Sequence, residues 1–156
     1  MIEISTNSAG QALFDHIGAA AAVQAWDDSL GMVETTVHGN WALSTTTPAD
    51  QLTLLDAFVA PNSHLDDASR AYGLSLLGNV EPSQVFGLSP GPPPAGIRAA
   101  KTGRYPSLGV RNTIGWIQAD GRSYLIATFC QREPSDQSGE AAMEAIASAT
   151  WSKLSS

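Results

Sequence analysis

A proline-rich run at residues 90–94, Pro-Gly-Pro-Pro-Pro, divides the sequence into two parts of different character. Proline fixes φ and has no N–H to donate, so this run can form neither a helix nor a ladder and should be extended, in polyproline conformation. Before the run, apolar residues recur at helical spacing; after it, they occur in short runs typical of strands. We therefore expect one α+β domain over 1–156, with a helical part over 1–88 and a sheet with a terminal helix over 96–156.

Four helices are expected in the first part, over residues 8–17, 19–30, 48–60 and 63–78. The third has the clearest start, because Thr47 offers a capping hydroxyl and Pro48 suits the first helical position. Asp50 then places an acid three residues after the cap, where it is favoured. In the fourth helix the spacing predicts a buried stripe of Leu65, Ala68, Tyr72 and Leu76.

Three strands are expected in the second part, over residues 97–101, 110–118 and 123–130. The last two are joined at Asp120-Gly121, a favoured pair for a tight hairpin turn, so the sheet should be an antiparallel meander. A terminal helix should then cover one side of the sheet with a single apolar face. The residues expected on that face are Met143, Ile146, Ala147, Thr150 and Leu154.

The charge balance and the rarer residue types limit the classes of function. Eight basic residues against fifteen acidic ones give a net charge of −7 without a basic cluster, so we expect no nucleic-acid partner. No apolar run approaches the roughly 18–20 residues of a spanning helix, and the first residues do not resemble a signal peptide. Cys130 is the only cysteine and the three histidines have no ligand-like spacing, so neither a metal site nor a cofactor is expected.

Three short motifs, each ordinary alone, occur in an informative order along the chain. A Ser-x-Asn motif precedes the first expected helix, a threonine run begins the third, and a Lys-Thr-Gly motif ends the first expected strand. The motifs are Ser5-Thr6-Asn7, Thr45-Thr46-Thr47-Pro48 and Lys101-Thr102-Gly103. Together they span most of the chain and suggest a serine-acylating site in which Ser-x-Asn and Lys-Thr-Gly converge.

This order resembles that of the serine β-lactamase and penicillin-binding (DD-peptidase) superfamily, most closely its class A-like members. The resemblance implies an acyl-enzyme mechanism, in which a second hydroxyl relays a proton to the leaving nitrogen. Ser5 would be that hydroxyl. Lys101 would supply a positive field to Ser5 and to a substrate carboxylate. These two residues are the expected catalytic residues.

The resemblance also implies a binding groove for a β-lactam or peptidoglycan-like ligand. Asn7 would bond the ligand's amide, Thr102 its carboxylate, and Gly103 would leave room for it along the strand edge. Arg111 lies one strand further on and, by alternation, points away from Val110 and Asn112. It could reach a carboxylate near Lys101 or simply be solvated.

The Ser-x-x-Lys motif that carries the nucleophile in this superfamily is absent, because the residues three before Lys101 and Lys153 are Arg98 and Thr150. The chain therefore looks like the C-terminal part of such a hydrolase, inactive alone and, by resemblance, extracytoplasmic. Glu34 is the only acid within residues 31–46, and a solvated loop carboxylate is the commoner explanation for it than a water-activating base.

Two other interpretations stay open. The chain could be a non-catalytic descendant that keeps the groove for carboxylate ligands, or an α+β interaction domain in which Ser5 and Asn7 merely cap a helix.

The strand at 123–130 would also have an unpaired outer edge if a neighbouring strand from an N-terminal segment is missing. Because this run is rich in strand formers, we expect the chain to form a homo-oligomer through that edge.

Overall fold

The computed structural model describes residues 1–88 and 96–154, so the proline-rich run lies outside the described residues. Four helices come first: α1 (Asn7–His16), α2 (Ala19–Leu30), α3 (Pro48–Val59) and α4 (Asp67–Gly78). An antiparallel sheet follows, with strands β1 (Ile97–Tyr105), β2 (Val110–Ala119) and β3 (Arg122–Cys130), and the chain continues into α5 (Asp136–Leu154). Short 3-10 turns are η1 (Trp41–Leu43), η2 (Pro82–Gln84) and η3 (Pro106–Leu108). The α+β fold expected from the sequence is confirmed.

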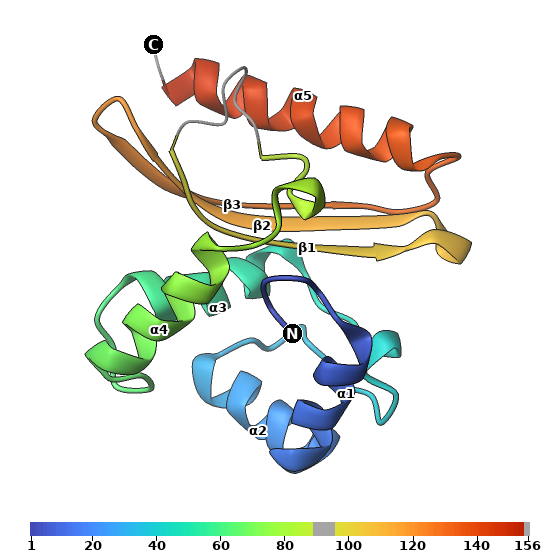
Figure 1. Ribbon diagram of the computed structural model, residues 1–156, viewed down its shortest axis with the longest axis vertical. Helices are drawn as coiled ribbons and strands as arrows, with labels where there is room; N and C mark the ends of the chain where they lie inside the picture. Colours follow the sequence, from blue (N-terminus) through green and yellow to red (C-terminus); the bar gives the residue numbers. More distant parts are fainter. Residues whose placement is uncertain (89–95, 155–156) are drawn as a thin grey trace.

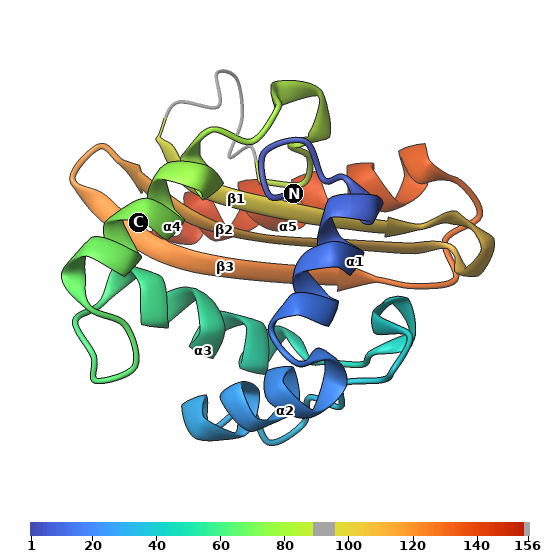
Figure 2. The same cartoon turned by 60° about the horizontal axis from the view of Figure 1, so that its bottom comes forward.

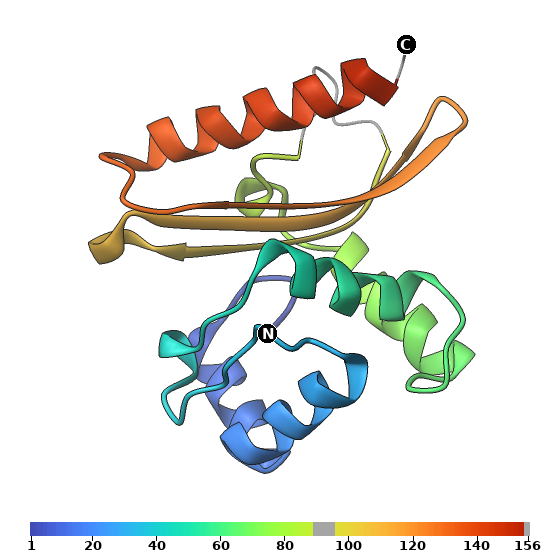
Figure 3. The same ribbon diagram turned by 180° about the vertical axis from the view of Figure 1, so that it is seen from behind.

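The sheet lies between two helical layers (Figure 1), with α5 on one face and α1 to α4 on the other. The view from behind shows the same arrangement (Figure 3), and the tilted view shows α1 crossing in front of the strands (Figure 2). Each face of the sheet has its own apolar cluster. The cluster beneath α5 contains Leu88, Ala100, Ile117, Ile126 and Ala147. The cluster beneath α3 and α4 contains Leu55, Leu77 and Ala99, with Ile114, Trp116 and Leu125 packed against it.

Local sequence explains the most regular elements. The Thr47 hydroxyl accepts a hydrogen bond from the main-chain N–H of Asp50 at 3.2 Å and so caps α3, with Pro48 in its first turn. At the β2–β3 turn Asp120 has φ 50° and Gly121 φ 75°, the two left-handed residues that a tight hairpin requires.

The buried stripe predicted for α4 is wrong. The helix starts at Asp67 with Asp66 as its N-cap, and the residues it buries are Gly73 and Leu77, whereas Tyr72 is 67% exposed. Gly73 is needed because a Cβ there would lie 2.4 Å from the ring of Phe58. In α5, likewise, Met143 and Ala147 are buried as expected while Ile146 and Leu154 stay exposed.

The strand register decides which side chains face the helical layer. Lys101 pairs with Ile114 and Arg104 pairs with Arg111, in an order β1-β2-β3. Paired residues share a face and neighbours alternate, so Lys101 and Asn112 lie on the side of α3 and Arg111 on the side of α5. Within the described residues, β1 and β3 are the edges of the sheet.

Candidate functional site

Lys101 and Ser5 are in contact although 96 residues separate them in the sequence. The Lys101 Nζ donates hydrogen bonds to Ser5 Oγ at 2.8 Å and to the main-chain oxygen of Thr102 at 2.7 Å. Burial lowers the pKa of the Lys101 ammonium, because removal from water disfavours the charged form. The first and last motifs found in the sequence therefore meet at one place, where a cation lies against a hydroxyl.

The backbone around Ser5 brings its hydroxyl to this position. Ser5 has φ 50°, in the left-handed region, and the next residue, Thr6, occupies the N-cap position of α1. Because Thr6 holds the N-cap position, neither Ser5 nor Asn7 is the N-cap that the capping alternative supposed. The side chain of Thr6 makes no capping hydrogen bond. Asn7 is the first residue of α1 and is exposed, close in sequence to the serine.

Thr102 and Gly103 continue β1 past the lysine. The Thr102 hydroxyl donates a 2.6 Å hydrogen bond to the main-chain oxygen of Gln84 in η2. Apart from Gly103 itself and its two neighbours in the chain, no described residue has an atom within 4 Å of where a Cβ on Gly103 would be, so the strand is uncovered at this point. Asn112 pairs with Gly103 on the neighbouring strand.

A hollow of about 200 Å³ opens beside these residues. It is lined by Thr46, Gln51, Lys101, Thr102, Gly103, Asn112, Thr113, Ile114 and Phe129. Only Lys101, Thr102 and Gly103 among these belong to the site predicted from sequence; the other six did not enter it, although Thr46 belongs to the threonine run. The hollow has hydroxyl, amide and ammonium groups at its strand side and an aromatic ring beyond them, a lining suited to a small polar ligand with an apolar part.

A buried carboxylate fixes the loop that carries Thr46. The Asp50 carboxylate accepts bonds from the N–H of Glu34 at 2.9 Å and from the Thr35 hydroxyl at 2.7 Å. Since the Thr35 proton is used there, the Thr46 hydroxyl at 2.8 Å must donate to Thr35 Oγ1. Thr46 in turn accepts from Gln51 Nε2 at 3.2 Å. Glu34 is exposed, as expected for a solvated loop acid, and takes part here through its main chain.

Arg111 does not lie in the groove, which corrects the prediction made for it. Its side chain is 1% exposed on the face covered by α5, where it forms an ion pair with Asp136 and donates to the main-chain oxygen of Val110. The register explains the error, because it places Lys101 on the opposite face of the sheet. Arg111 is thus neither a carboxylate ligand near Lys101 nor solvated.

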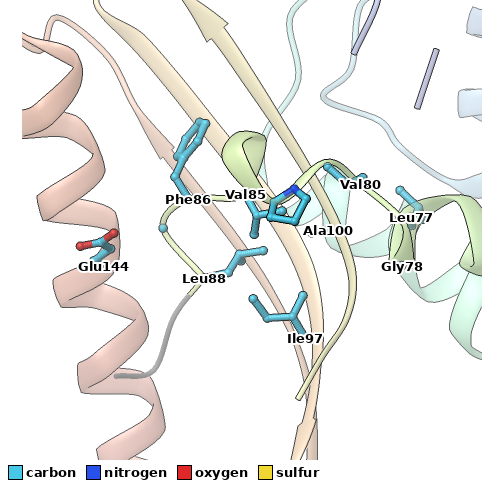
Figure 4. A pocket seen from close by; sticks show the side chains of 11 residues that line it. Leu77, Gly78, Val80, Val85, Phe86, Leu88, Ile97, Ala100 and Glu144 are labelled. Carbon is cyan, nitrogen blue, oxygen red and sulfur yellow. The ribbon is translucent and has the colours of Figure 1, made fainter. Parts of the chain in front are cut away.

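A second hollow, of about 300 Å³, lies on the other side of β1, between the segment after α4 and α5 (Figure 4). Its lining is apolar except for Glu144, which projects from α5. Among the residues that the structure describes, no group of three or more His, Cys, Asp or Glu side chains could hold a metal ion. Nor does any helix in the described ranges have the length and apolar character to cross a membrane.

The fold and the order of its motifs define the class of protein, the serine β-lactamase and penicillin-binding superfamily. Within it, the chain belongs to the beta-lactamase enzyme family, whose sequence profile matches residues 1–154. No curated protein matches the chain by sequence.

Solved structures show the same fold at low identity. PBP-A superposes with a TM-score of 0.83 and 21% identity, covering 99% of this chain and 58% of that one. A PBP-A variant solved as an acyl-enzyme complex with penicillin G has a TM-score of 0.84, 24% identity and coverages of 99% and 59%. A class A β-lactamase from Mycobacterium abscessus has a TM-score of 0.81, 20% identity and coverages of 97% and 61%. The chain thus spans about three-fifths of the length of these structures.

Proposed function

We propose that this chain is the C-terminal part of a penicillin-recognising serine hydrolase with an acyl-enzyme mechanism, and that alone it does not hydrolyse. The observation that carries the proposal is the 2.8 Å contact between Lys101 Nζ and Ser5 Oγ. It joins the two motifs that the superfamily uses together. The nucleophilic serine and its lysine base are absent from the sequence, so another segment would have to supply them.

In this proposal Ser5 relays a proton to the leaving nitrogen of the substrate. Its oxygen accepts from the Lys101 ammonium, which leaves the Ser5 proton available to be donated. The positive charge of Lys101 also stabilises any negative charge that develops on the serine oxygen while the proton moves. Burial strengthens that electrostatic effect, because the local dielectric is lower than in water.

The proposed ligand is a β-lactam or a peptidoglycan-like peptide, bound through its carboxylate and amide. An ammonium has three N–H donors, one more than the two contacts that Lys101 makes with described residues. Lys101 and Thr102 would bind the carboxylate, and Asn7 would bond the amide. The uncovered strand at Gly103 gives an extended ligand space. Such substrates would place the parent protein outside the cytoplasm.

Activity of the chain alone tests the proposal directly. With no activated serine, we expect no steady release of product from a chromogenic cephalosporin. Steady release that Ser5→Ala abolishes would overturn the proposal and make Ser5 the nucleophile. The genomic sequence upstream of Met1 is the second test, since a Ser-x-x-Lys motif in frame there would supply the missing segment.

A non-catalytic ligand-binding protein derived from this fold is the second candidate. It is favoured by one observation, that the Lys101 and Gly103 groove is formed in a chain that lacks Ser-x-x-Lys. An upstream sequence without that motif, together with calorimetric binding of benzylpenicillin, would support this candidate over the first. Absence of binding would leave an interaction domain with no ligand site.

A further inference from the structure

Ser5 holds an unusual backbone conformation at the point where its hydroxyl meets Lys101. A serine with φ 50° is in a sparsely populated region, which costs on the order of 1 kcal/mol or more and persists only where the surroundings enforce it. The 2.8 Å contact with Lys101 depends on that conformation, because the backbone direction at Ser5 sets where Oγ points. Something in the fold must therefore restrain the residues on both sides of the serine.

The segment containing η2 supplies the restraint on the N-terminal side. The N–H of Glu81 donates to the main-chain oxygen of Glu3 at 2.8 Å, and Gln84 Nε2 donates to the main-chain oxygen of Ile4 at 3.0 Å. On the other side the chain enters α1, whose Gly10 N–H bonds to the oxygen of Thr6. Ser5 is thus the one residue between two fixed pieces of backbone.

Gln84 also bonds to the lysine motif. Its main-chain oxygen accepts the 2.6 Å hydrogen bond from the hydroxyl of Thr102. The turn that holds it is rigid, because Gln84 N–H bonds to Glu81 at 2.8 Å and Phe86 and Leu88 are buried just after it. One residue therefore bonds to the serine segment through its side chain and to the lysine strand through its main chain.

We propose that Gln84 is a positioning residue for the site. Its side-chain amide fixes where Ser5 lies against Lys101, and its main-chain oxygen fixes the direction of the Thr102 hydroxyl. A hydroxyl has one proton. The Thr102 hydroxyl must therefore break its hydrogen bond to the Gln84 oxygen before it can donate to the carboxylate of a ligand. This inference rests on the proposed function for the ligand roles of Ser5 and Thr102, but the contacts themselves do not depend on it.

The test is the titration of Lys101 followed by NMR of its side chain. Lys153 is the only other lysine, so it serves as an internal reference. Gln84→Met keeps the length of the side chain and removes the amide donor. Asn79→Leu is the matched control, since it removes another amide bond, from Asn79 Nδ2 to the Ser75 oxygen at 2.9 Å at the end of α4. Ser5→Ala sets the size of the shift when the serine hydroxyl is gone.

We expect Gln84→Met to shift the Lys101 pKa in the same direction as Ser5→Ala and by at least half as much, while Asn79→Leu leaves it unchanged. A wild-type Lys101 titration in folded Gln84→Met would overturn the proposal, as would a Ser5→Ala variant with no shift. If Gln84→Met does not fold, Gln84→Asn, whose amide is one methylene too short to reach Ile4, is subject to the same criterion.

A parallel titration of the wild-type chain with benzylpenicillin separates this inference from the proposed function. Failure of the wild type to bind would count against the proposed function and leave the Lys101 result intact. Binding by the wild type with no loss in Gln84→Met would overturn the role of Gln84 alone. We expect Gln84→Met to weaken benzylpenicillin binding several-fold.

Discussion

The ion pair between Arg111 and Asp136 should respond unequally to loss of its two partners. Arg111 is 1% exposed, whereas the side chain of Asp136 is 59% exposed. Replacing Asp136 with alanine leaves a guanidinium buried beneath α5 with the Val110 oxygen as its remaining acceptor among the described residues. Replacing Arg111 with methionine leaves a carboxylate that water can solvate. The two variants remove the same interaction but leave very different groups behind.

The magnitudes follow from that difference. Breaking a fully buried pair typically costs about 3–5 kcal/mol, because a charge is left unpaired in the interior. With Asp136 more than half exposed, its attraction is partly screened, and we expect about 2–3 kcal/mol for Asp136→Ala. Arg111→Met keeps most of the buried volume and should cost about 1 kcal/mol. In the double variant no guanidinium remains, so its stability should be close to that of Arg111→Met.

Urea unfolding of the four proteins, followed by circular dichroism with the m-value checked for two-state behaviour, measures these free energies. The single losses sum to about 3–4 kcal/mol and the double variant should lose about 1 kcal/mol, so the coupling between the two sites should be about 2–3 kcal/mol. An Arg111→Met variant that loses as much stability as Asp136→Ala would refute the reasoning, because it would show that burial of the arginine is not what makes the pair costly to break. Benzylpenicillin binding should be unchanged in Arg111→Met, since that side chain lies on the other face of the sheet.

Three further predictions concern the site, the pH dependence and the sheet edge. Lys101→Ala should weaken a carboxylate ligand by about 1–3 kcal/mol in calorimetry, the scale of a charge-assisted hydrogen bond, whereas Lys153→Ala should not; equal affinities would make Lys101 a strand-end residue only. Burial, and then the nearby carboxylates of Asp28 and Asp50, raise the pKa of Asp27, so the folded state binds this proton more tightly than the unfolded chain. Asp27→Asn should accordingly increase the free energy of unfolding at neutral pH, by an amount that shrinks as the pH falls toward 3.8; a gain independent of pH would contradict this. Finally, β3 is an edge strand within the described residues, so light scattering should show self-association that increases with concentration; a monomer whose β3 amides are strongly protected from exchange would show that the edge is covered.

Features set by neighbours in the sequence could be predicted from the sequence. The start of α3 at Pro48 depends on the Thr47 hydroxyl a few atoms away, and the β2–β3 hairpin depends on Asp120 and Gly121 alone. The approach of Ser5 to Lys101 is not local. The sequence predicts this contact only through the resemblance of its motif order to a known superfamily.

What could not be predicted depends on partners distant in the chain. Arg111 is correctly assigned to the opposite side from Asn112 by alternation, but only the β1–β2 register tells which side carries Lys101. In α4, the apolar periodicity favours the face of Tyr72 and Leu76, but the close approach of Gly73 to the ring of Phe58 turns Gly73 and Leu77 inward. Gln84 belongs to no motif, so nothing in its surroundings in the sequence indicated that it would bond to both halves of the site.

The separation of 96 residues between Ser5 and Lys101 ties the site to the cooperativity of the whole fold. Ser5 belongs to the helical layer and Lys101 to the sheet, so their contact exists only while the two layers are docked. Closing so long a loop is entropically costly, and no local piece of the chain could retain a partly formed site. A ligand that binds there would therefore stabilise the docked layers against opening, by about 2.7 kcal/mol at a concentration one hundred times its Kd. Occupancy of the groove should then slow hydrogen exchange throughout both layers, including amides that lie far from the ligand.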